Sequence, residues 1–354
     1  MTRLDRFISI GAALAGCAML LVGYPATQPA PAAPPVSASV AWPQAAMTTM
    51  NTTLADGTAY QPGIFLAAAT SVGSAPSRDH RFLRLVVVSG AGSIRQLRSL
   101  PAGASPWFGS LTAAGDVLAW AESTGQNQQL WTINLRDGRP ARELTADTGQ
   151  AVLNGSAYDL LIANSRVYWT ATAPGVTEIR SVALTGGPVD VRPETGNWTL
   201  SAWPWLVNGS GDVLGTTAMR DMVTGRDVPI SGGGDRQTTH CDPVWCVVTS
   251  LADGGDRIDV MHPDGTGRQV VASGQVAPGI DDTVALERYV VVSQVSAYSD
   301  LTGTRQLVVF DLNTQRMVSI SAGARTVSYT DGVLWWSTGT QDSPVWHALQ
   351  LPTV

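Results

Sequence analysis

From about residue 59 onward, short apolar runs alternate with turn-forming residues, and helical spacing is almost absent. The runs are rich in β-branched and aromatic residues, and Gly, Asp, Asn or Pro interrupts them about every eight to twelve residues. This spacing is typical of an all-β fold. One type of run follows a turn and recurs at residues 63–70, 115–123, 164–172, 211–219, 242–250, 287–295 and 331–339. A second type comes shortly afterwards, at residues 82–90, 129–138, 178–187, 257–265, 306–314 and 344–352.

These runs form a repeat. Most copies are about 43 to 50 residues apart, but the step from Val213 to Val244 is only 31, so the fourth copy is short or irregular. A period in the forties with about four short strands predicts a β-propeller of seven four-stranded blades. Six blades are the alternative if the fourth copy is an insertion. We expect the Thr-rich segment 45–54 to close the ring as an outer strand, which would remove an open sheet edge.

Several repeat endings share a pattern. In "NLRDGRPARELT" (134–145) and "MHPDGTGRQVVAS" (261–273) a strand ends in Asp-Gly, turns, and resumes with a basic residue before apolar ones; "ALTGGPVDVRP" (183–193) is a looser copy. The pattern resembles that of TolB-type propellers and covers about 300 residues as architecture. The resemblance implies a structural motif with no catalytic residue, in a family of protein-binding platforms, peptidase appendages and sugar or polymer lyases. We therefore interpret Asp137-Gly138 and Asp264-Gly265 as turns between outer strands.

The N-terminus predicts export. Arg3 and Arg6 precede an apolar run from Phe7 to Tyr24, so residues 1–24 are a signal peptide or membrane anchor. "LAGC" resembles a bacterial lipobox, which would make Cys17 a lipidation site. An uncleaved anchor, a lipoprotein and a cleaved signal all remain open, and each places the chain outside the cytoplasm. Residues 25–44 are a Pro/Ala-rich linker that favours a semi-rigid spacer, and residues 45–354 are the propeller domain.

Charge and cysteine content limit which catalytic groups and which partners the sequence allows. All 22 basic residues are Arg and the net charge is -6, so lysine nucleophiles and P-loop lysines are excluded and nucleic acid is a poor partner. Without Cys17, Cys241 and Cys246 make an even pair, which favours a local disulfide in an exported protein. We expect neither a metal site nor another cofactor, and we expect a monomer.

The candidate ligand-binding residues are aromatic and acidic. Trp107 and the group Trp198, Trp203 and Trp205 precede predicted strands, where the innermost strands and channel loops should lie. Tryptophans at a channel mouth stack on sugars or clamp peptides, although packing between blades is the alternative. Asp281 and Asp282 form the only adjacent acidic pair and begin a blade. A carboxylate pair can serve glycan chemistry, or simply start a strand.

No nucleophile elbow, zinc helix motif or phosphate loop is found in the sequence. We therefore predict a non-enzymatic, extracytoplasmic propeller that is tethered to the membrane through its N-terminus. It would act as a binding or scaffold module for an envelope protein or glycan. The alternative is a lyase or glycosidase, or a peptide-acting enzyme, with its site at the channel mouth.

Overall fold

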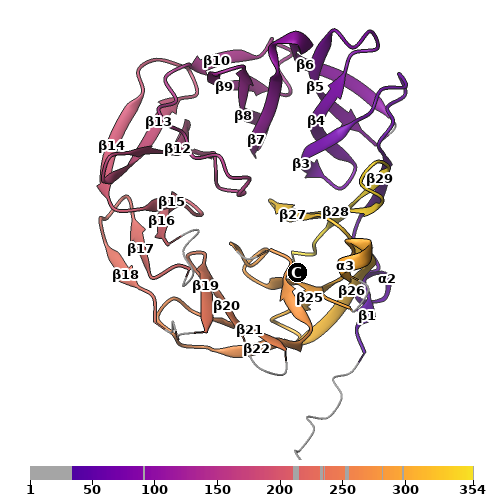
Figure 1. Cartoon of the computed structure of the whole chain (residues 1–354), viewed down its shortest axis with the longest axis vertical. Helices are drawn as coiled ribbons and strands as arrows, with labels where there is room; N and C mark the ends of the chain where they lie inside the picture. The colour runs from indigo at the N-terminus through magenta and orange to yellow at the C-terminus, as the bar shows by residue number, and fades with distance from the viewer. Residues whose placement is uncertain are drawn as a thin grey trace, which may run out of the picture. The chain divides into compact units, whose positions relative to one another are not determined.

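The computed structural model describes residues 34–90, 92–209, 215–231, 234, 236–251, 255–280, 282–296 and 299–353. Seven sheets, each built on a blade of four antiparallel strands, stand around a central channel (Figure 1). The predicted all-β propeller with seven blades is confirmed, and the six-bladed alternative is wrong.

Each blade runs from the channel to the rim in chain order. Blades 1 to 3 contain β3 (Gln61–Ala67), β4 (Thr70–Pro76), β5 (Phe82–Ser89) and β6 (Ser93–Pro101); β7 (Pro106–Ala114), β8 (Val117–Thr124), β9 (Asn127–Asn134) and β10 (Arg142–Thr145); and β11 (Leu161–Ala163), β12 (Arg166–Ala173), β13 (Val176–Ala183) and β14 (Asp190–Thr195). A 3-10 helix, η1 (Ala102–Ala104), joins blades 1 and 2.

Blades 4 and 5 contain β15 (Trp198–Leu200), β16 (Trp205–Asn208), β17 (Ala218–Asp221) and β18 (Asp227–Pro229), then β19 (Gln237–Cys241), β20 (Cys246–Ser250), β21 (Asp256–Met261) and β22 (Gln269–Gly274). Blade 6 contains β23 (Val276–Pro278), β24 (Tyr289–Gln294), the short helix α3 (Ser299–Thr302), β25 (Arg305–Asp311) and β26 (Arg316–Ala324). Blade 7 contains β27 (Val327–Thr330), β28 (Val333–Gly339) and β29 (Pro344–Gln350).

The N-terminal part of the propeller closes the ring. β2 (Met47–Asn51) pairs antiparallel with β29 and becomes the outer strand of blade 7, so the closing strand predicted within residues 45–54 is confirmed. In addition, β1 (Val36–Ser37) lies parallel to β26 on the edge of blade 6, and α2 (Ala38–Ala41) follows it. Residues 36–41, which the sequence interpretation places in the linker, thus belong to the compact unit that spans Val36–Val354.

The predicted export segment 1–24, with Cys17, lies outside the described residues. Within the part of the chain that is described, no helix has the length and apolar character needed to cross a membrane.

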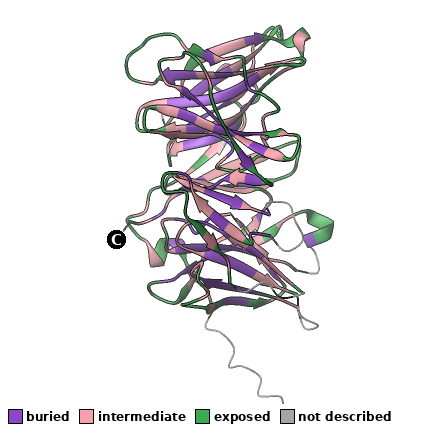
Figure 2. Cartoon of the chain, turned by 90° about the vertical axis from the view of Figure 1, so that its left-hand side faces the viewer, coloured by how far each residue is buried: buried purple, intermediate pink, exposed green. Residues whose placement is uncertain are grey.

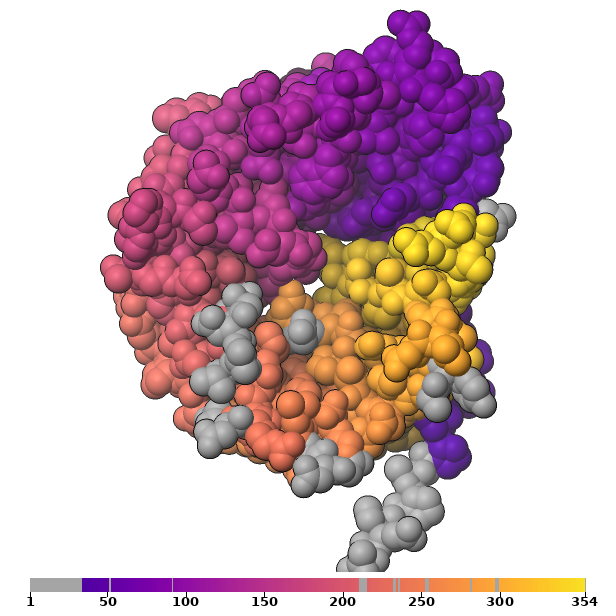
Figure 3. Space-filling view, in the orientation of Figure 1, coloured from indigo at the N-terminus to yellow at the C-terminus, as the bar shows by residue number. Residues whose placement is uncertain are grey.

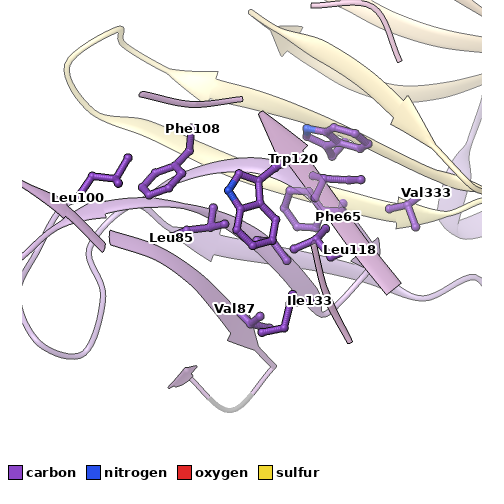
Figure 4. Packing of buried hydrophobic residues seen from close by; sticks show 13 residues of the cluster. Phe65, Leu85, Val87, Leu100, Phe108, Leu118, Trp120, Ile133 and Val333 are labelled. Carbon is purple, nitrogen blue, oxygen red and sulfur yellow. The ribbon is translucent and has the colours of Figure 1, made fainter. Parts of the chain in front are cut away.

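Alternation along the strands buries side chains between neighbouring blades (Figure 2). One core cluster extends over blades 7, 1 and 2, and Trp120 of β8 lies in it with no exposed surface. Figure 4 shows Trp120 among Phe65, Leu85 and Leu118. The Nε1–H of Trp120 donates to the carboxylate of Glu122 at 3.2 Å, which gives the buried indole its polar partner. Trp169 in β12 and Trp335 and Trp336 in β28, the second strands of blades 3 and 7, are buried as well, so these tryptophans are part of the core.

The Asp-Gly endings lie in the outer turns. Gly138 (φ +66°) lies between β9 and β10, and Gly265 (φ +85°) lies between β21 and β22. A positive φ is readily adopted by glycine, which explains the residue type at these two positions. The interpretation of Asp137-Gly138 as a turn between outer strands is confirmed.

Candidate functional site

Two connected cavities lie along the propeller axis. The channel cavity, of about 580 Å³, is lined by residues from the inner strands or inner loops of all seven blades. The mouth cavity, of about 690 Å³, is lined by the ends of the innermost strands and the turns that follow them in blades 2 to 7. The two cavities share Ala157, Tyr158, Tyr329 and Thr330. Figure 3 shows the molecule from one face, with an opening near the centre of the ring.

The mouth turns of blades 6 and 7 are tight hairpins. Leu286 (φ +53°) and Glu287 (φ +54°) connect β23 and β24, while Asp331 (φ +46°) and Gly332 (φ +83°) connect β27 and β28. In blade 6 Ala285 pairs with Tyr289, so that loop has three residues, whereas in blade 7 Thr330 pairs with Val333 and leaves a two-residue loop. Both loops contain two successive positive φ values, which in the two-residue loop are typical of a type I′ hairpin. Asp and Gly are favoured in such a turn, whereas Leu and Glu adopt it at an energetic cost. Both turns place an acidic residue in the lining of the mouth cavity.

Tyr329 holds these two turns together. Its hydroxyl oxygen accepts the backbone N–H of Leu286 and of Gly332, each at 3.1 Å. The turns also approach each other closely, because a Cβ atom added to Gly332 would lie 3.7 Å from the side chain of Leu286. Glu287 and Asp331 are therefore carried by adjacent, mutually fixed turns. Burial raises the pKa of Tyr329, so its hydroxyl stays protonated at neutral pH.

The mouth turn of blade 5 is held by a buried carboxylate. Asp242 accepts the backbone N–H groups of Val244 at 2.8 Å and of Trp245 at 2.7 Å through Oδ1. Its Oδ2 accepts the N–H of Val284 in blade 6 at 2.8 Å, which connects the two blades. Burial raises the pKa of Asp242, and these three backbone hydrogen bonds oppose that rise. Asp242 thus uses its carboxylate to fix the wall of the cavity.

A disulfide closes the same turn. Cys241 and Cys246 are directly opposite each other at the end of β19 and the start of β20, and their sulfur atoms are bonded. Both residues are buried. The predicted disulfide is confirmed, and it encloses Asp242, Pro243 and Val244, which line the mouth cavity.

The four candidate tryptophans are divided between the two ends of the innermost strands. Trp203 and Trp205 line the mouth cavity, and the ring of Trp203 lies 4.3 Å from that of Tyr168. Trp198 is buried at the start of β15, where its Nε1–H donates to the carbonyl of Thr195 and the Arg220 guanidinium lies over its ring. Trp107 is 41% exposed at the start of β7, whose other end contributes to the mouth cavity.

The strand positions in blade 4 explain this division. The repeat pattern predicts a strand at 211–219 that follows all three clustered tryptophans, but the second strand of the blade is β16, which begins at Trp205. Residues 211–214 of the predicted strand lie outside the described residues, and the next described strand, β17, begins at Ala218. Trp203 consequently occupies the mouth turn, with a cis peptide bond to Pro204, and Trp198 occupies the opposite end of the inner strand.

The structure describes only one member of the acidic pair. Asp281 lies outside the described residues. Asp282 lines the channel cavity and accepts the hydroxyl of Ser156 from blade 3 at 2.8 Å. Asp282 therefore lies below the mouth tryptophans, on the channel side of Tyr158.

Several residues of the site escaped the sequence analysis. Tyr158 lies between the cavities, near Asp242 and Asp282, and burial raises the pKa of its hydroxyl. Asp159 is buried beside the channel and accepts the N–H of Gly155 at 2.7 Å and the hydroxyl of Ser110 at 3.1 Å. Burial raises the pKa of Asp159. The signal that could have found Glu287 and Asp331 is their position in the turn after each innermost strand.

The mouth cavity has an acidic lining. Asp242, Glu287 and Asp331 contribute to it, and its described lining contains neither Arg nor His. Glu287 and Asp331 are exposed, and their carboxylates form no hydrogen bond or ion pair with any described residue. Partial desolvation raises the pKa of Asp331. Among the described residues, no group of three or more His, Cys, Asp or Glu side chains is arranged to hold a metal ion.

No protein-family model matches this chain, and no curated protein matches it in sequence. Solved structures do share its fold. An oligogalacturonate lyase in complex with manganese has a TM-score of 0.53 at 10% identity, with 87% of this chain and 96% of that chain covered. This chain is a seven-bladed β-propeller.

A puromycin-hydrolyzing peptidase of Mycobacterium tuberculosis is similar with a TM-score of 0.54 at 14% identity, covering 83% of this chain and 52% of that one. TolB from Acinetobacter baumannii is also among the similar structures, with a TM-score of 0.41 at 11% identity over 72% of this chain and 64% of that chain. At these identities the likeness concerns the fold alone.

Proposed function

We propose that the protein is a non-enzymatic binding module of the cell envelope that holds its ligand in the mouth cavity. The observation that carries the proposal is the concave cavity of about 690 Å³ with aromatic walls formed by Tyr158, Trp203, Trp205 and Tyr329. Its volume lies in the range of small-ligand sites, which combine mostly apolar walls with a few polar groups. The envelope location rests on the N-terminal pattern of Arg3, Arg6 and the apolar run from Phe7 to Tyr24.

The walls of the cavity are fixed before any ligand arrives. Tyr329 joins the turns of blades 6 and 7, Asp242 joins blades 5 and 6, and the Cys241–Cys246 disulfide closes the turn of blade 5. A preformed wall loses little conformational entropy on binding, so more of the contact energy appears as affinity. This favours recognition by a rigid site.

One observation favours a second candidate, an enzyme that acts on polysaccharides or peptides. Glu287 and Asp331 place two exposed carboxylates on adjacent turns, and partial desolvation raises the pKa of Asp331. Glycosidases use a carboxylate pair in which one member has a raised pKa. The carboxylates at this mouth repel polyanionic substrates such as the oligogalacturonate named for a similar structure, so a neutral or basic polymer is the better substrate for this candidate.

The test compares two tryptophans at opposite ends of the innermost strands. The full-length chain is titrated with soluble peptidoglycan fragments and with short envelope-derived peptides, while tryptophan fluorescence reports binding. Trp203→Ala is expected to weaken binding by about tenfold or more, since a stacked aromatic group contributes on the order of 1 kcal/mol or more. Trp107→Ala is the matched control and should leave the affinity unchanged.

Equal affinities for the two variants would refute the mouth cavity as the site. Product analysis of the same mixtures by mass spectrometry separates the two candidates. Intact ligand after prolonged incubation supports a binding module, whereas cleaved glycan or peptide that disappears in Asp331→Asn establishes the enzyme instead.

A further inference from the structure

We propose that a polar cavity between blades 6 and 7 binds a small carboxylic acid that also carries hydroxyl or amino groups. The cavity has a volume of about 470 Å³ and adjoins the channel cavity, with which it shares Gly279 and Val327. This inference goes beyond the proposed function, because the position, the charge and the ligand of this site all differ from those of the mouth cavity.

The strand directions show where the cavity lies. β24 leaves the mouth turn of blade 6 at Tyr289 and ends at Gln294, so Ser293 lies at the end away from the mouth. Arg305 begins β25, which is antiparallel to β24, and therefore lies at the same end. Arg325 lies between the end of β26 and the start of β27, the innermost strand of blade 7. All three of these polar residues line the cavity, which therefore opens at the end of the blades opposite to the mouth.

Two of these side chains face the interface between the blades. Ser293 follows Val291 by two positions in β24. Arg305 precedes Leu307 by two positions in β25. Side chains two residues apart in a strand point to the same face of the sheet. Val291 and Leu307 belong to the core cluster that also contains Leu334 of blade 7, so the cavity is a polar continuation of this apolar interface.

Two guanidinium groups line the cavity. Arg305 is exposed, and its side chain forms no hydrogen bond or ion pair with any described residue. Arg325 is half-buried, and its Nη1 donates to the carbonyl of Thr302 at 2.8 Å. Gly303 leaves room for this guanidinium, because a Cβ added there would lie 3.1 Å from Nη2. A guanidinium has five N–H donors, so Arg325 is held in place and keeps donors for an oxyanion, which such a group binds through two parallel hydrogen bonds.

The hydroxyl of Ser293 is an independent indication of a ligand. Ser293 is 6% exposed, and its Oγ has no hydrogen-bond partner among the described residues. Unlike the fully enclosed Oγ of Ser201, it retains accessible surface in the lining of the cavity. Gly279 keeps the adjacent space open, because a Cβ there would lie 3.4 Å from this Oγ and 2.8 Å from the side chain of Val291. A nearly buried hydroxyl without a partner is costly, and a bound carboxylate or hydroxyl would supply that partner.

Asp300 restricts the class of ligand. Its exposed carboxylate lines the same cavity and forms no ion pair with either arginine. A carboxylate repels a dianion such as phosphate and accepts hydrogen bonds from hydroxyl or ammonium groups. A monocarboxylate with neighbouring donors therefore suits both the arginines and Asp300, whereas an inorganic anion suits the arginines alone.

The probe is gluconate, and its neutral counterpart is sorbitol, in which a hydroxymethyl group replaces the carboxylate. Both are titrated into the full-length chain at low ionic strength, with calorimetry as the readout. We expect gluconate to bind at least about tenfold more tightly than either sorbitol or inorganic phosphate. L-serine tests the second source of the same chemistry: tighter binding of serine than of gluconate assigns the site to amino acids, and the reverse assigns it to hydroxy acids.

Two exposed arginines of blade 6 provide the matched variants. Arg305→Gln removes a charge from the cavity, whereas Arg316→Gln removes an unpaired charge at the other end of the blade, where β26 begins. Arg305→Gln should weaken gluconate binding by about three- to tenfold, and Arg316→Gln should leave it unchanged. Equal losses in the two variants would mean that only the net charge of the protein matters, and would overturn the site.

Ser293→Ala separates a role in binding from a role in folding. The hydroxyl has no partner within the described protein, so its removal should leave the thermal midpoint unchanged or raise it. The same variant should weaken gluconate binding by about threefold or more. A lowered midpoint with unchanged affinity would contradict the proposal.

The remaining outcomes concern the whole site. Equal affinity for gluconate and sorbitol, tighter binding of phosphate, or no binding of any probe overturns the inference. Trp203→Ala changes the mouth cavity alone and should leave gluconate binding unchanged. Failure of this site and failure of the proposed function are therefore distinguishable, because each has its own variant and its own ligand.

Discussion

Blades 7, 1 and 2 differ from blades 4 and 5 in how they are held together. The strands of blade 1 have seven to nine residues, while those of blade 4 have three or four. The first region shares one core cluster of 13 buried residues across three blades. The cores on the two sides of blade 4 are separate and smaller, and one of them contains the disulfide cysteines.

Blade 4 relies on polar links where its apolar contacts are few. Glu194 of blade 3 binds Arg192 and, through Oε2, Arg220 of blade 4, each at 2.6 Å. The Arg220 guanidinium also donates hydrogen bonds to both carboxylate oxygens of Asp227. The regular blades thus form the larger core, whereas Trp203 and Trp205 of blade 4 are only partly buried: they pack against the two smaller cores and also line the mouth. In this propeller the blade with the shortest strands supplies Trp203 and Trp205 to a cavity that blades 2 to 7 line together.

The largest expected effect comes from two chemically identical core substitutions. Leu85 in blade 1 and Leu206 in blade 4 are both fully buried. Leu85→Ala should lower the free energy of unfolding by about 3–5 kcal/mol, and Leu206→Ala by about 2–3 kcal/mol, because the smaller core can collapse further around the missing atoms. Urea titrations of the two variants measure both losses. An equal or larger loss for Leu206→Ala would break the distinction between the two regions.

A smaller effect is expected from removing the disulfide. The double variant Cys241→Ala/Cys246→Ala should lose about 2–3 kcal/mol of stability, because the closed loop is short and the unfolded chain gains only limited freedom. Adding a reductant should destabilise the wild-type protein by a similar amount and leave the double variant unaffected. If the wild-type protein unfolds at the same temperature with and without reductant, the disulfide does not compensate for the small cores.

The smallest expected effect is a loss of folding stability at acid pH, caused by a carboxylate beside blade 1. Hydrogen bonds from Thr58 and Arg84 to the Asp56 carboxylate hold its pKa at about 2, below the ordinary value of 3.8. A depressed pKa stabilises the folded protein above the unfolded-state pKa, and this contribution disappears as the pH falls toward 2. It should amount to at most about 1 kcal/mol, because the pair lies near the surface.

The measurement compares the thermal midpoints of the wild-type protein and Asp56→Asn between pH 2 and pH 6. The two midpoints should differ at pH 6 and converge as the pH approaches 2. A difference that stays constant over this interval would show that the charge of Asp56 contributes nothing to stability.

The local pattern of apolar and turn-forming residues was sufficient to predict most of the architecture. The repeat spacing predicted seven blades, and the Thr-rich segment around β2 predicted the closing strand, because both depend on alternation and turn residues that are visible in the sequence. Blade 1 shows the limit of this signal. The run at 63–70 was grouped with the second strands, but it largely forms the innermost strand β3. The second strand, β4, is rich in small residues; a Cβ on its Gly73 would lie 2.1 Å from the backbone oxygen of Gln61.

The candidate site was predicted only in part. Trp203 and Trp205 line the mouth cavity, but Trp198 is core and Trp107 lies at the other end of an innermost strand. The sequence places all four before a strand and cannot tell which end of the inner strand each one occupies. That distinction depends on where the strands of the short fourth repeat begin and end.

The Asp-Gly dipeptides show which features follow from the sequence and which depend on the tertiary structure. The sequence alone determined that Asp137-Gly138 and Asp331-Gly332 form turns, because the left-handed backbone of a tight hairpin favours such residues. Only the closed ring decided that the first turn lies at the rim and the second at the channel mouth, where Tyr329 holds Asp331 next to Glu287. Turn formation is a local backbone property, whereas convergence of side chains depends on how seven separate sheets pack around one axis.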